Sequence, residues 1–336
     1  MDVESMRSSM VNVAIKDMGI YLPSQVLDNK TVIETFGLDV DEAWIESRTG
    51  IKQRHWLEED KTTSDMAVQV AKDILARRNL QPNQLDRIIL ATCSGDYPSP
   101  ATAAVIAQKL QTRCSAFDIS AACSGFLFAL EAGVAAIRNG DERVLVLAAD
   151  TRSRFINKQD HRSVVLFADG AAGALLEPVD SGGFLGMFTG TDGTLPSLGA
   201  WIPAGGAINP TSAETVAQGE HYLKVDTLPQ IFPLFVGHVK EAVDIALTKS
   251  GLSLDDIDVF VPHQGNAHLI DYIIEALDFP RQRTVNVVYR HGNSSGASLP
   301  IALAEAMAEG IIKPGDRVLL ASCGAGNTYG AVVHQF

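Results

Sequence analysis

Three side chains of this sequence are of the types that covalent catalysis through a thiol requires: a cysteine, a histidine and an asparagine. Cys123 lies in the stretch DISAACSGFLFAL (118–130), where small residues surround it and an apolar segment follows. A thiol reacts as its thiolate, and the free N–H groups of a helix N-terminus lower the pKa of a thiol placed there. Cys123 is therefore a candidate nucleophile, and its own N–H a candidate donor to an oxyanion. The other interpretation is a buried structural cysteine, the usual place of a free cysteine.

His263 in VPHQGN and Asn293 in RHGNSSGAS are the candidates for the polar groups of the same site. Both side chains can donate hydrogen bonds to oxygen that gains negative charge during a reaction. Each also has a plain structural interpretation, because His263 can be a loop histidine and Asn293 can cap the following helix. Other histidines compete for the role of His263, namely His55, His161, His268 and His291. The functional interpretation is favoured by where the elements of the chain place these residues.

Short apolar runs alternate along the chain with alanine-rich segments of helical periodicity. The apolar runs are residues 86–93, 143–150, 258–264 and 317–324. Near-continuous apolar strands are buried on both faces, which is typical of α/β folds with helices on each side of a sheet. The spacing predicts helices over residues 101–110, 125–140, 237–251 and 299–310. A glycine closes the last three, at Gly140, Gly251 and Gly310.

The order of these elements repeats, because residues 79–91 match 251–263 and residues 139–149 match 313–322. The sequence therefore predicts two duplicated α/β halves, with Cys123 and Asn293 at related strand-to-helix junctions. We expect a loose tail over residues 1–10, a first half over 11–182 that carries the cysteine, and a second half over 183–336 that carries the histidine and the asparagine. Open α/β sheets bind ligands beyond the carboxyl ends of their strands, so the three residues are expected in one crevice.

Composition narrows the classes of protein further. Hydrophobic residues make up 46% of the 336 residues and the net charge is −13, which excludes a disordered chain and argues against nucleic-acid binding. The four cysteines form no C-x-x-C pair, so we expect neither a zinc site nor a disulfide framework. The chain begins without the basic and apolar segments of a signal peptide and has no run long enough to span a membrane, so we expect a cytoplasmic protein.

Several longer stretches together resemble the 3-oxoacyl-ACP synthase III (ketoacyl synthase III) family of the thiolase superfamily. They follow the family's order over nearly the whole chain: DEAWIESRTGIKQRH (41–55), DISAACSGF, LFADGAAGALL (166–176), VPHQGNAHLI, RHGNSSGASLPIAL and SCGAGNTYGAVV. Thiolases proper carry a second catalytic cysteine where this chain has Asn293, so the resemblance excludes them.

The resemblance implies a homodimer with the five-layer αβαβα thiolase fold and no metal or redox cofactor. Cys123 would accept an acyl group from an acyl-coenzyme A substrate. His263 and Asn293 would then donate hydrogen bonds to the thioester oxygen of a malonyl unit, which becomes an enolate as CO2 leaves. The oxyanion at the acylated cysteine would lie between the N–H groups of Cys123 and Ala325. Acyl carrier protein is the implied partner that brings the malonyl unit.

The resemblance also implies contacts to coenzyme A. The residues that match the family's contacts to adenine, phosphates and pantetheine are Trp44, Arg48, Thr49 and Asn266. The family's adenine-stacking arginine is replaced by His161, and Arg162 directly after it is the candidate for that role. An imidazole cannot fully copy the stacking and phosphate pairing of an arginine. Pro233 and His268 replace basic residues that would dock acyl carrier protein, so with this net charge we expect that docking to be weaker or differently placed.

Two further replacements concern the acyl pocket. Ser99 matches a phenylalanine that a loop of the partner subunit commonly inserts into the pocket, and Cys323 matches a phenylalanine that lines it. Both changes are from large to small, so we expect an acyl group longer or bulkier than acetyl. A small residue in a tight turn is the other interpretation of Cys323.

Alternative functions follow from these departures. One is a specialised ketosynthase or acyltransferase of secondary metabolism that belongs to the same enzyme class. Another is a catalytically silent subunit, against which the joint presence of Cys123, His263 and Asn293 argues. A dinucleotide-dependent oxidoreductase has little support, because GNSSGAS and CGAGNTYG lack the G-x-G-x-x-G pattern.

Overall fold

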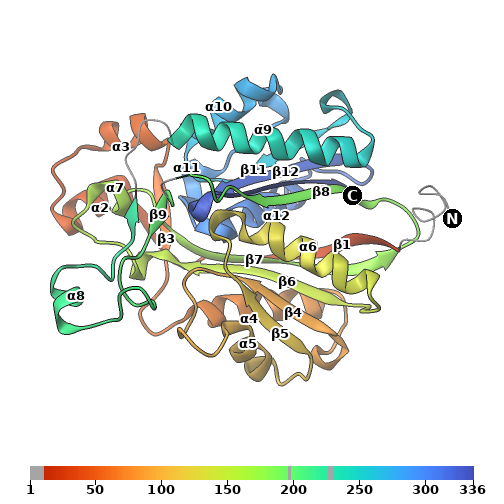
Figure 1. Cartoon of the computed structure of the whole chain (residues 1–336), viewed down its shortest axis with the longest axis horizontal. Helices are drawn as coiled ribbons and strands as arrows, with labels where there is room; N and C mark the ends of the chain where they lie inside the picture. The colour runs from red at the N-terminus through yellow and green to blue at the C-terminus, as the bar shows by residue number, and fades with distance from the viewer. Residues whose placement is uncertain (1–10, 196–197, 226–230) are drawn as a thin grey trace.

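The computed structural model describes residues 11–195, 198–225 and 231–336. The predicted loose tail, residues 1–10, lies outside the described residues. The chain folds into two β-sheets with helices between and outside them (Figure 1).

The first sheet has five strands in the order β1-β7-β6-β4-β5. Their bounds are β1 (Asn12–Tyr21), β7 (Asp169–Val179), β6 (Val144–Thr151), β4 (Arg87–Ala91) and β5 (Ser115–Ile119). Strand β4 runs parallel to both β5 and β6, whereas β7 runs antiparallel to β6 and β1. Strands β4 and β6 are mostly apolar because helices cover both of their faces, whereas the edge strand β5 is only partly buried.

The second sheet has four strands in the order β11-β12-β13-β8. Their bounds are β11 (Val259–Pro262), β12 (Arg317–Gly324), β13 (Thr328–Gln335) and β8 (Gly183–Thr191). When the first sheet is followed from β1 and the second from β8, neighbouring strands come from corresponding places along the two halves of the chain. The second sheet has no named strand at the position of β5, but an isolated parallel bridge between Phe260 and Thr284 lies there. This common order supports the predicted duplication, and the division at residue 182 stays a prediction.

Two central helices, α6 (Gly125–Arg138) and α12 (Ser298–Ala308), lie between the sheets. Their apolar side chains and the inner faces of both sheets form the largest buried cluster, which includes Phe126, Leu130, Leu299 and Leu303. Helices α4 (Thr63–Arg77) and α5 (Thr102–Leu110) cover the outer face of the first sheet. Helices α9 (Ile231–Ser250) and α10 (Ala267–Leu277) cover the outer face of the second sheet. The five layers of the predicted αβαβα fold are thus confirmed (Figure 1).

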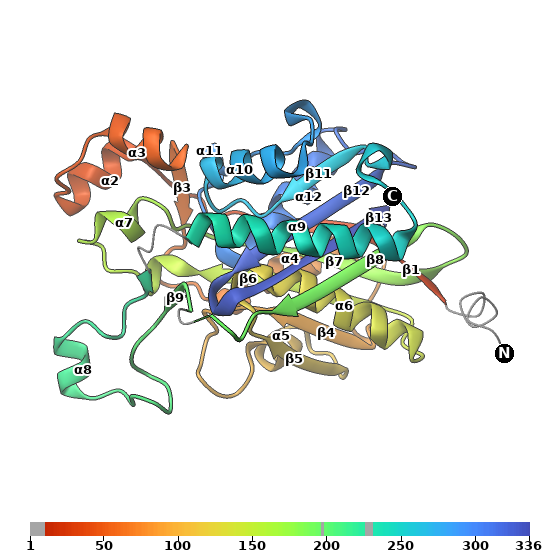
Figure 2. The ribbon, with the colours of Figure 1, turned by 45° about the horizontal axis from the view of Figure 1, so that its top comes forward.

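Smaller elements gather at one end of the sheets. They are β2 (Gln25–Asp28), α2 (Asn29–Phe36), α3 (Glu42–Thr49), β3 (Gln53–Trp56), α7 (His161–Val164), β9 (Ala200–Trp201), α8 (Ala213–Ala217), β10 (Lys224–Val225) and α11 (Val288–His291). Figure 2 shows α8 on a loop that projects beside the sheets, and α3 next to the end of α10. No described helix has the length and apolar character needed to cross a membrane.

The predicted elements differ from the observed ones mainly at their ends. Helix α9 begins at Ile231, six residues before the predicted start, because Pro233 lies in its first turn, where a missing N–H costs nothing. Strand β11 ends at Pro262, so His263 is the first residue beyond the strand. Gly251 and Gly310 adopt φ of 72° and 70° directly behind their helices, as expected for closing glycines.

Candidate active site

Cys123 lies in a short 3₁₀ turn, η2 (Ala122–Ser124), that leads directly into the central helix α6. Ala122 has a φ of 47°, a left-handed conformation that a residue with a side chain rarely adopts outside functional sites. The corresponding turn before α12 is η6 (Ser295–Ala297), and it begins with the same conformation at Ser295, with a φ of 55°. The junctions are therefore related as predicted, but the position that matches Cys123 is Gly296 rather than Asn293.

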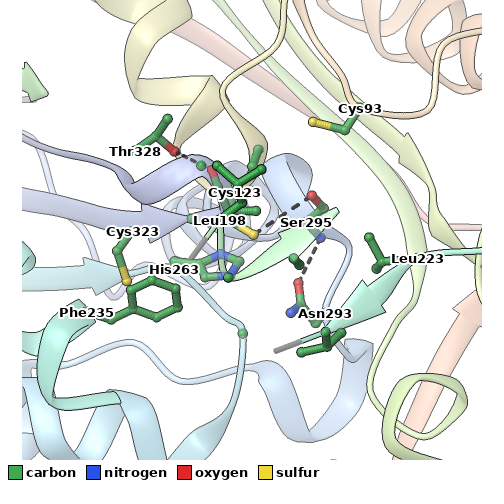
Figure 3. A pocket seen from close by; sticks show the side chains of 18 of the residues that line it. Cys93, Cys123, Leu198, Leu223, Phe235, His263, Asn293, Ser295, Cys323 and Thr328 are labelled. Atoms are coloured by element: carbon green, nitrogen blue, oxygen red, sulfur yellow. Dashed lines mark hydrogen bonds between the residues drawn. The ribbon is translucent and has the colours of Figure 1, made fainter. Parts of the chain in front are cut away.

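A pocket of about 560 Å³ opens above Cys123 (Figure 3). One wall comes from the carboxyl ends of the first sheet's parallel strands and includes Cys93, Ser120 and Arg152. The opposite wall comes from the second sheet and includes His263 and Cys323. Figure 3 shows Cys93 and Cys323 on opposite sides of the Cys123 thiol. The crevice expected from the strand ends is thus present, and both halves of the chain build it.

The thiol of Cys123 is surrounded mainly by neutral groups. Its Sγ lies 3.9 Å from Oγ of Ser295 (Figure 3). Burial raises the pKa of the Cys123 thiol to about 12, although the positive charge of Arg152 acts in the opposite direction. The N–H groups at the start of α6 also favour the thiolate. At neutral pH the resting site therefore holds a thiol, which must lose its proton as it attacks.

His263 follows strand β11 and is held in one tautomer by its neighbours. Its Nδ1 lies 2.7 Å from Oγ of Ser298, and that oxygen also lies 3.3 Å from the backbone N–H of Gln264. The Gln264 N–H donates to the hydroxyl oxygen, and among the described residues Nδ1 is the one acceptor within reach of the buried Ser298 hydroxyl, so that hydroxyl donates to Nδ1. Burial lowers the pKa of His263 to about 4, so the ring is neutral and carries its one proton on Nε2. His263 can therefore donate a hydrogen bond from Nε2 at any physiological pH.

Asn293 is fixed through both its backbone and its side-chain oxygen. Its backbone forms an isolated parallel bridge with Phe167, and its Oδ1 accepts a hydrogen bond of 2.9 Å from the N–H of Ser295 (Figure 3). This leaves the Nδ2 group as the donor. A methyl group placed on Gly265 would lie 2.8 Å from Nε2 of His263 and 3.5 Å from Nδ2 of Asn293. The two donors therefore converge on one region of the pocket.

The backbone opposite the nucleophile is kept open by Gly324. A methyl group placed on Gly324 would lie 2.8 Å from the backbone N of Cys123 and 3.2 Å from its Cβ. Ala325, the predicted second oxyanion donor, follows directly and lines the same pocket. Because residue 324 has no side chain, there is space for an oxygen atom next to the backbone N–H groups of Cys123 and Ala325.

The predicted coenzyme A contacts lie at the end of the pocket where α3 meets α10. The guanidinium carbon of Arg48 lies 5.1 Å from the centre of the Trp44 ring, and the His161 ring packs edge-on against Trp44 with 5.1 Å between ring centres. Asn266 lines the pocket, caps α10 and donates a hydrogen bond of 3.0 Å to the carbonyl of Arg48. Trp44, Arg48 and Asn266 are therefore brought together. The residue that packs against Trp44 is His161 and not the predicted Arg162, and the contacts of all these residues to coenzyme A stay a prediction.

Two other residues predicted to contact coenzyme A already bind groups of the chain itself. The hydroxyl of Thr49 is buried; it donates to the carbonyl of Ile45 and accepts from the N–H of Ile51. Arg162 is exposed and pairs with Asp160, with 2.9 Å between Nε and Oδ1. Both would have to exchange these partners in order to bind a phosphate.

The two predicted acyl-pocket residues lie in different places. Cys323 is buried and lines the pocket, and burial raises the pKa of its thiol well above the ordinary value, which makes it an apolar wall rather than a second nucleophile. Ser99 lies on the exposed loop between β4 and α5 and is not among the described residues that line this chain's pocket. Its role as a residue inserted from a partner subunit stays a prediction.

The sequence did not lead us to predict three residues of the site: Arg152, Ser295 and Ser298. Ser295 and Ser298 lie in the quoted stretch around Asn293, and their spacing of three residues along a helix start was a usable signal. Arg152 follows the strand 143–150 as the first of three nearby arginines, and nothing in the sequence distinguishes it from the other two.

Two family models match this chain. The model described as 3-Oxoacyl-[acyl-carrier-protein (ACP)] synthase III matches residues 117–193, and the model of the C-terminal part of 3-Oxoacyl-[acyl-carrier-protein (ACP)] synthase III matches residues 247–336. The first match contains the Cys123 turn and the second contains His263 and Asn293.

Whole-chain comparisons give the same result. The chain is 38% identical to a beta-ketoacyl-[acyl-carrier-protein] synthase III of Symbiobacterium thermophilum, over 95% of this chain and 97% of that protein. It is 39% identical to the beta-ketoacyl-[acyl-carrier-protein] synthase III 3 of Streptomyces coelicolor, over 94% of each.

Among solved structures, it superposes with a TM-score of 0.87 on the 3-oxoacyl-(acyl carrier protein) synthase III of Pseudomonas aeruginosa, at 32% identity and with 97% of this chain and 98% of that chain covered. The priming beta-ketosynthase of the R1128 polyketide biosynthetic pathway gives a TM-score of 0.84 at 29% identity, with 97% of each chain covered.

Proposed function

Because the chain belongs to the 3-oxoacyl-[acyl-carrier-protein] synthase III family of acyltransferases, we propose that it joins an acyl group to a malonyl unit in two steps at Cys123. In the first step the Cys123 sulfur attacks the carbonyl of an acyl-coenzyme A. The thiol proton leaves with the departing coenzyme A thiolate, and the acyl group stays on the cysteine. The oxyanion of this step is stabilised by the N–H groups of Cys123 and Ala325, in the space that Gly324 keeps open.

In the second step a malonyl thioester, carried by acyl carrier protein, enters the same pocket. Nε2 of His263 and Nδ2 of Asn293 donate hydrogen bonds to its thioester oxygen. The bond to the carboxylate breaks, CO2 leaves, and its electron pair forms an enolate whose negative charge those donors stabilise. The enolate carbon then attacks the acyl carbonyl on Cys123, and the cysteine departs to leave a 3-oxoacyl thioester.

The convergence of the two donors beside Gly265, across the pocket from the acyl acceptor, carries this proposal. It is tested by the mass of the intact protein after incubation with acyl-coenzyme A and then with malonyl-acyl carrier protein. Cys123→Ala should gain no acyl mass. His263→Ala and Asn293→Ala should gain the acyl mass and keep it when the malonyl thioester is added. Wild-type protein that gains no acyl mass from any acyl-coenzyme A would leave a silent subunit as the better proposal.

We also propose an acyl group longer than acetyl. Cys323 is small for its place in the wall of the pocket, and Phe232 and Phe235, which belong to the same apolar cluster, also line the pocket. Initial rates of acylation across a series of acyl chain lengths test this, with Cys323→Phe as the matched variant that shortens the pocket. A clear preference of the wild type for acetyl-coenzyme A would contradict it.

The specialised ketosynthase of secondary metabolism remains the second candidate, and the replacement of basic residues at the entrance favours it. Pro233 and His268 leave this lip without the charges that dock an acidic carrier, and His268 instead lies 2.8 Å from the carbonyl of Ser47. We propose a cytoplasmic homodimer in which the loop with Ser99 faces the partner's pocket. Sedimentation of the full chain and cross-linking from Ser99→Cys test the assembly.

A further inference from the structure

Arg152 brings an unpaired positive charge into the wall of the pocket. It begins the 3₁₀ turn η3 (Arg152–Arg154) directly after β6, its side chain is only 6% exposed, and it lines the pocket. Its Nε is buried without a hydrogen-bond partner. Over the described ranges of the chain its guanidinium forms no ion pair or hydrogen bond, and its one charge-related contact is with the Phe167 ring, 5.6 Å from the ring centre.

The two buried carboxylates on the neighbouring strand ends do not neutralise this charge. Asp150 accepts hydrogen bonds from the N–H of Cys93 at 2.8 Å, the hydroxyl of Ser94 at 2.7 Å and the N–H of Gly296 at 3.1 Å. Asp169 accepts from the N–H groups of Leu57 and Ser153 and from the Ser153 hydroxyl. Both carboxylates are thus held by neutral donors, and neither forms an ion pair with Arg152.

An arginine remains charged in proteins, and buried charges are almost always paired. From its place in the pocket and its empty donors we infer that Arg152 binds a carboxylate at the far end of the acyl chain, so that the acyl donor is a dicarboxylic acid thioester. The planar guanidinium can donate two parallel hydrogen bonds to such a carboxylate. This inference rests on the proposed function, because it names the substrate class of the same pocket.

The malonyl carboxylate is the other anion that enters this site, and two observations argue against it as the partner of Arg152. His263, one of the two donors for the malonyl thioester, belongs to the second-sheet wall, whereas Arg152 belongs to the first-sheet wall beside Cys93 and Ser120. The other donor, Asn293, is nearer, because its backbone bridges to Phe167, whose ring Arg152 contacts, so the malonyl KM of Arg152→Met is measured as well. A cation on the malonyl carboxylate would also stabilise the group that must leave as CO2, and would therefore stabilise the ground state more than the transition state.

The experiment measures acylation of Cys123 in the full-length protein with pairs of coenzyme A thioesters of equal carbon number. Succinyl, glutaryl and adipyl donors are compared with butyryl, pentanoyl and hexanoyl donors, and the methyl ester of the glutaryl donor removes the charge at nearly constant shape. We expect at least one dicarboxylic donor to exceed its neutral counterpart by about tenfold or more in kcat/KM. Arg152→Met should abolish or reverse that ratio while still being acylated by the neutral donors.

Matched variants keep the result interpretable. Arg154→Met removes a charge from the same turn, but this guanidinium binds the carbonyls of Glu58 and Glu59 and is not among the described residues that line the pocket, so the donor ratio should not change. Arg152→Lys keeps the charge without the planar fork and should give an intermediate ratio. Thermal melting of each variant shows whether the fold is retained.

Three outcomes would overturn the inference. If neutral donors acylate the wild type as fast as dicarboxylic donors do, the inference is wrong and the proposed function is unaffected. An Arg152→Met variant with the wild-type donor ratio would also overturn it. So would a raised KM for malonyl-acyl carrier protein on pre-acylated Arg152→Met with no change in donor ratio, because Arg152 would then bind the malonyl carboxylate. Failure of every donor to acylate Cys123 would instead contradict the proposed function itself.

Discussion

The Ser298 hydroxyl lies 2.7 Å from Nδ1 of His263, and this contact sets which ring nitrogen carries the proton. The buried Ser298 hydroxyl has no other acceptor among the described residues, so it donates to Nδ1 and the proton of the neutral imidazole lies on Nε2. The donor that the condensation step requires is therefore present before any substrate binds.

Replacing Ser298 with alanine should slow condensation and spare acylation. Without the hydroxyl, Nδ1 loses its donor, and the imidazole no longer strongly prefers the tautomer with its proton on Nε2. The loss of one such hydrogen bond is worth ~1 kcal/mol, so we expect about a fivefold fall in kcat for condensation. Acyl transfer to Cys123, measured by mass, should stay within a factor of about two, and Ser298→Thr should restore most of the condensation rate. Equal losses in both steps would contradict a role through His263.

Replacing Gly324 with alanine should block the first step. The added methyl group would lie 2.8 Å from the backbone N of Cys123, where the oxyanion must lie. Removal of one oxyanion donor costs on the order of 100-fold in kcat, and we expect a loss of that size in the rate of Cys123 acylation. Gly237→Ala in helix α9 is the control, since a methyl group there meets no atom within 4 Å and Gly237 is neither in the left-handed region nor among the described residues that line the pocket. Normal acylation of the Gly324→Ala variant would exclude this space as the oxyanion site.

Alkylation of Cys123 by iodoacetamide should keep accelerating with pH. The pKa of the thiol is raised to about 12 by burial, so the thiolate fraction grows about tenfold per pH unit from pH 6 to pH 9. Peptide mass spectrometry separates Cys123 from the other cysteines, with Cys123→Ala as the reference. A plateau below pH 8 would mean that the N–H groups of α6 outweigh burial.

Acid should destabilise the fold through His263 and His334. Burial lowers the pKa of His263 to about 4 and that of His334 to about 3, and His334 Nε2 accepts a hydrogen bond from the N–H of Ile15. The unfolded chain binds a proton at each histidine below pH 6.5 and the folded chain does not, so each costs roughly 2 kcal/mol of unfolding free energy between pH 7 and pH 5.

His334→Gln tests the size of this effect, because the amide oxygen can accept from Ile15 without titrating. Urea unfolding at pH 7 and pH 5 should show a loss smaller by roughly 2 kcal/mol in this variant, while His263 and His55, whose pKa burial also lowers, keep their contributions. Asp169 acts in the opposite direction, since burial raises its pKa to about 6 and the folded chain gains its proton first. The difference between wild type and His334→Gln removes that contribution. An identical pH dependence in both proteins would contradict the assignment to His334.

Replacing Trp44 with alanine should raise the KM for acyl-coenzyme A. The ring contacts Arg48 and His161 next to Asn266, which lines the pocket, and it is the residue that matches the family's adenine contact. Loss of a stacking face costs ~1.4 kcal/mol, which corresponds to about a tenfold rise in KM. Acyl thioesters of N-acetylcysteamine lack the nucleotide, so their KM should not change. A rise for both substrates would place Trp44 in the fold of the entrance rather than in nucleotide binding.

The sequence predicted the parts of the site that lie on regular elements. His263 lies at the end of the apolar run 258–264 and Cys123 directly before the predicted helix 125–140, and the rule that ligands bind beyond strand ends places both in one crevice. The sequence predicted less accurately which residue of the second half corresponds to Cys123. Spacing along the chain placed Asn293 at the related junction, but spacing changes with loop length, and the structure shows that Gly296 is the counterpart of Cys123. The place of the Arg152 side chain in the pocket wall depends on a side-chain direction that no periodicity encodes.

Residues that depend on another chain could not be placed from one chain alone. Ser99 is exposed on its loop, and its predicted place in a pocket requires a second subunit. Thr49 and Arg162 matched a pattern of residue types, and the structure shows that each already has internal partners. Such competition between intramolecular and ligand contacts depends on distances, which residue types do not give.

The turn that carries the nucleophile is fastened by hydroxyl groups of the other sheet. Ser322 donates to the carbonyl of Cys123, Thr328 donates to the carbonyl of Ala121, and Ser124 donates back to the carbonyl of Thr328. The orientation of the Cys123 thiol thus depends on residues that lie far from Cys123 in the sequence. A recombinant that exchanges one half for that of a relative without these hydroxyl groups would lose the hydrogen bonds that orient the turn, so the reactivity of the thiol is a property of both halves together.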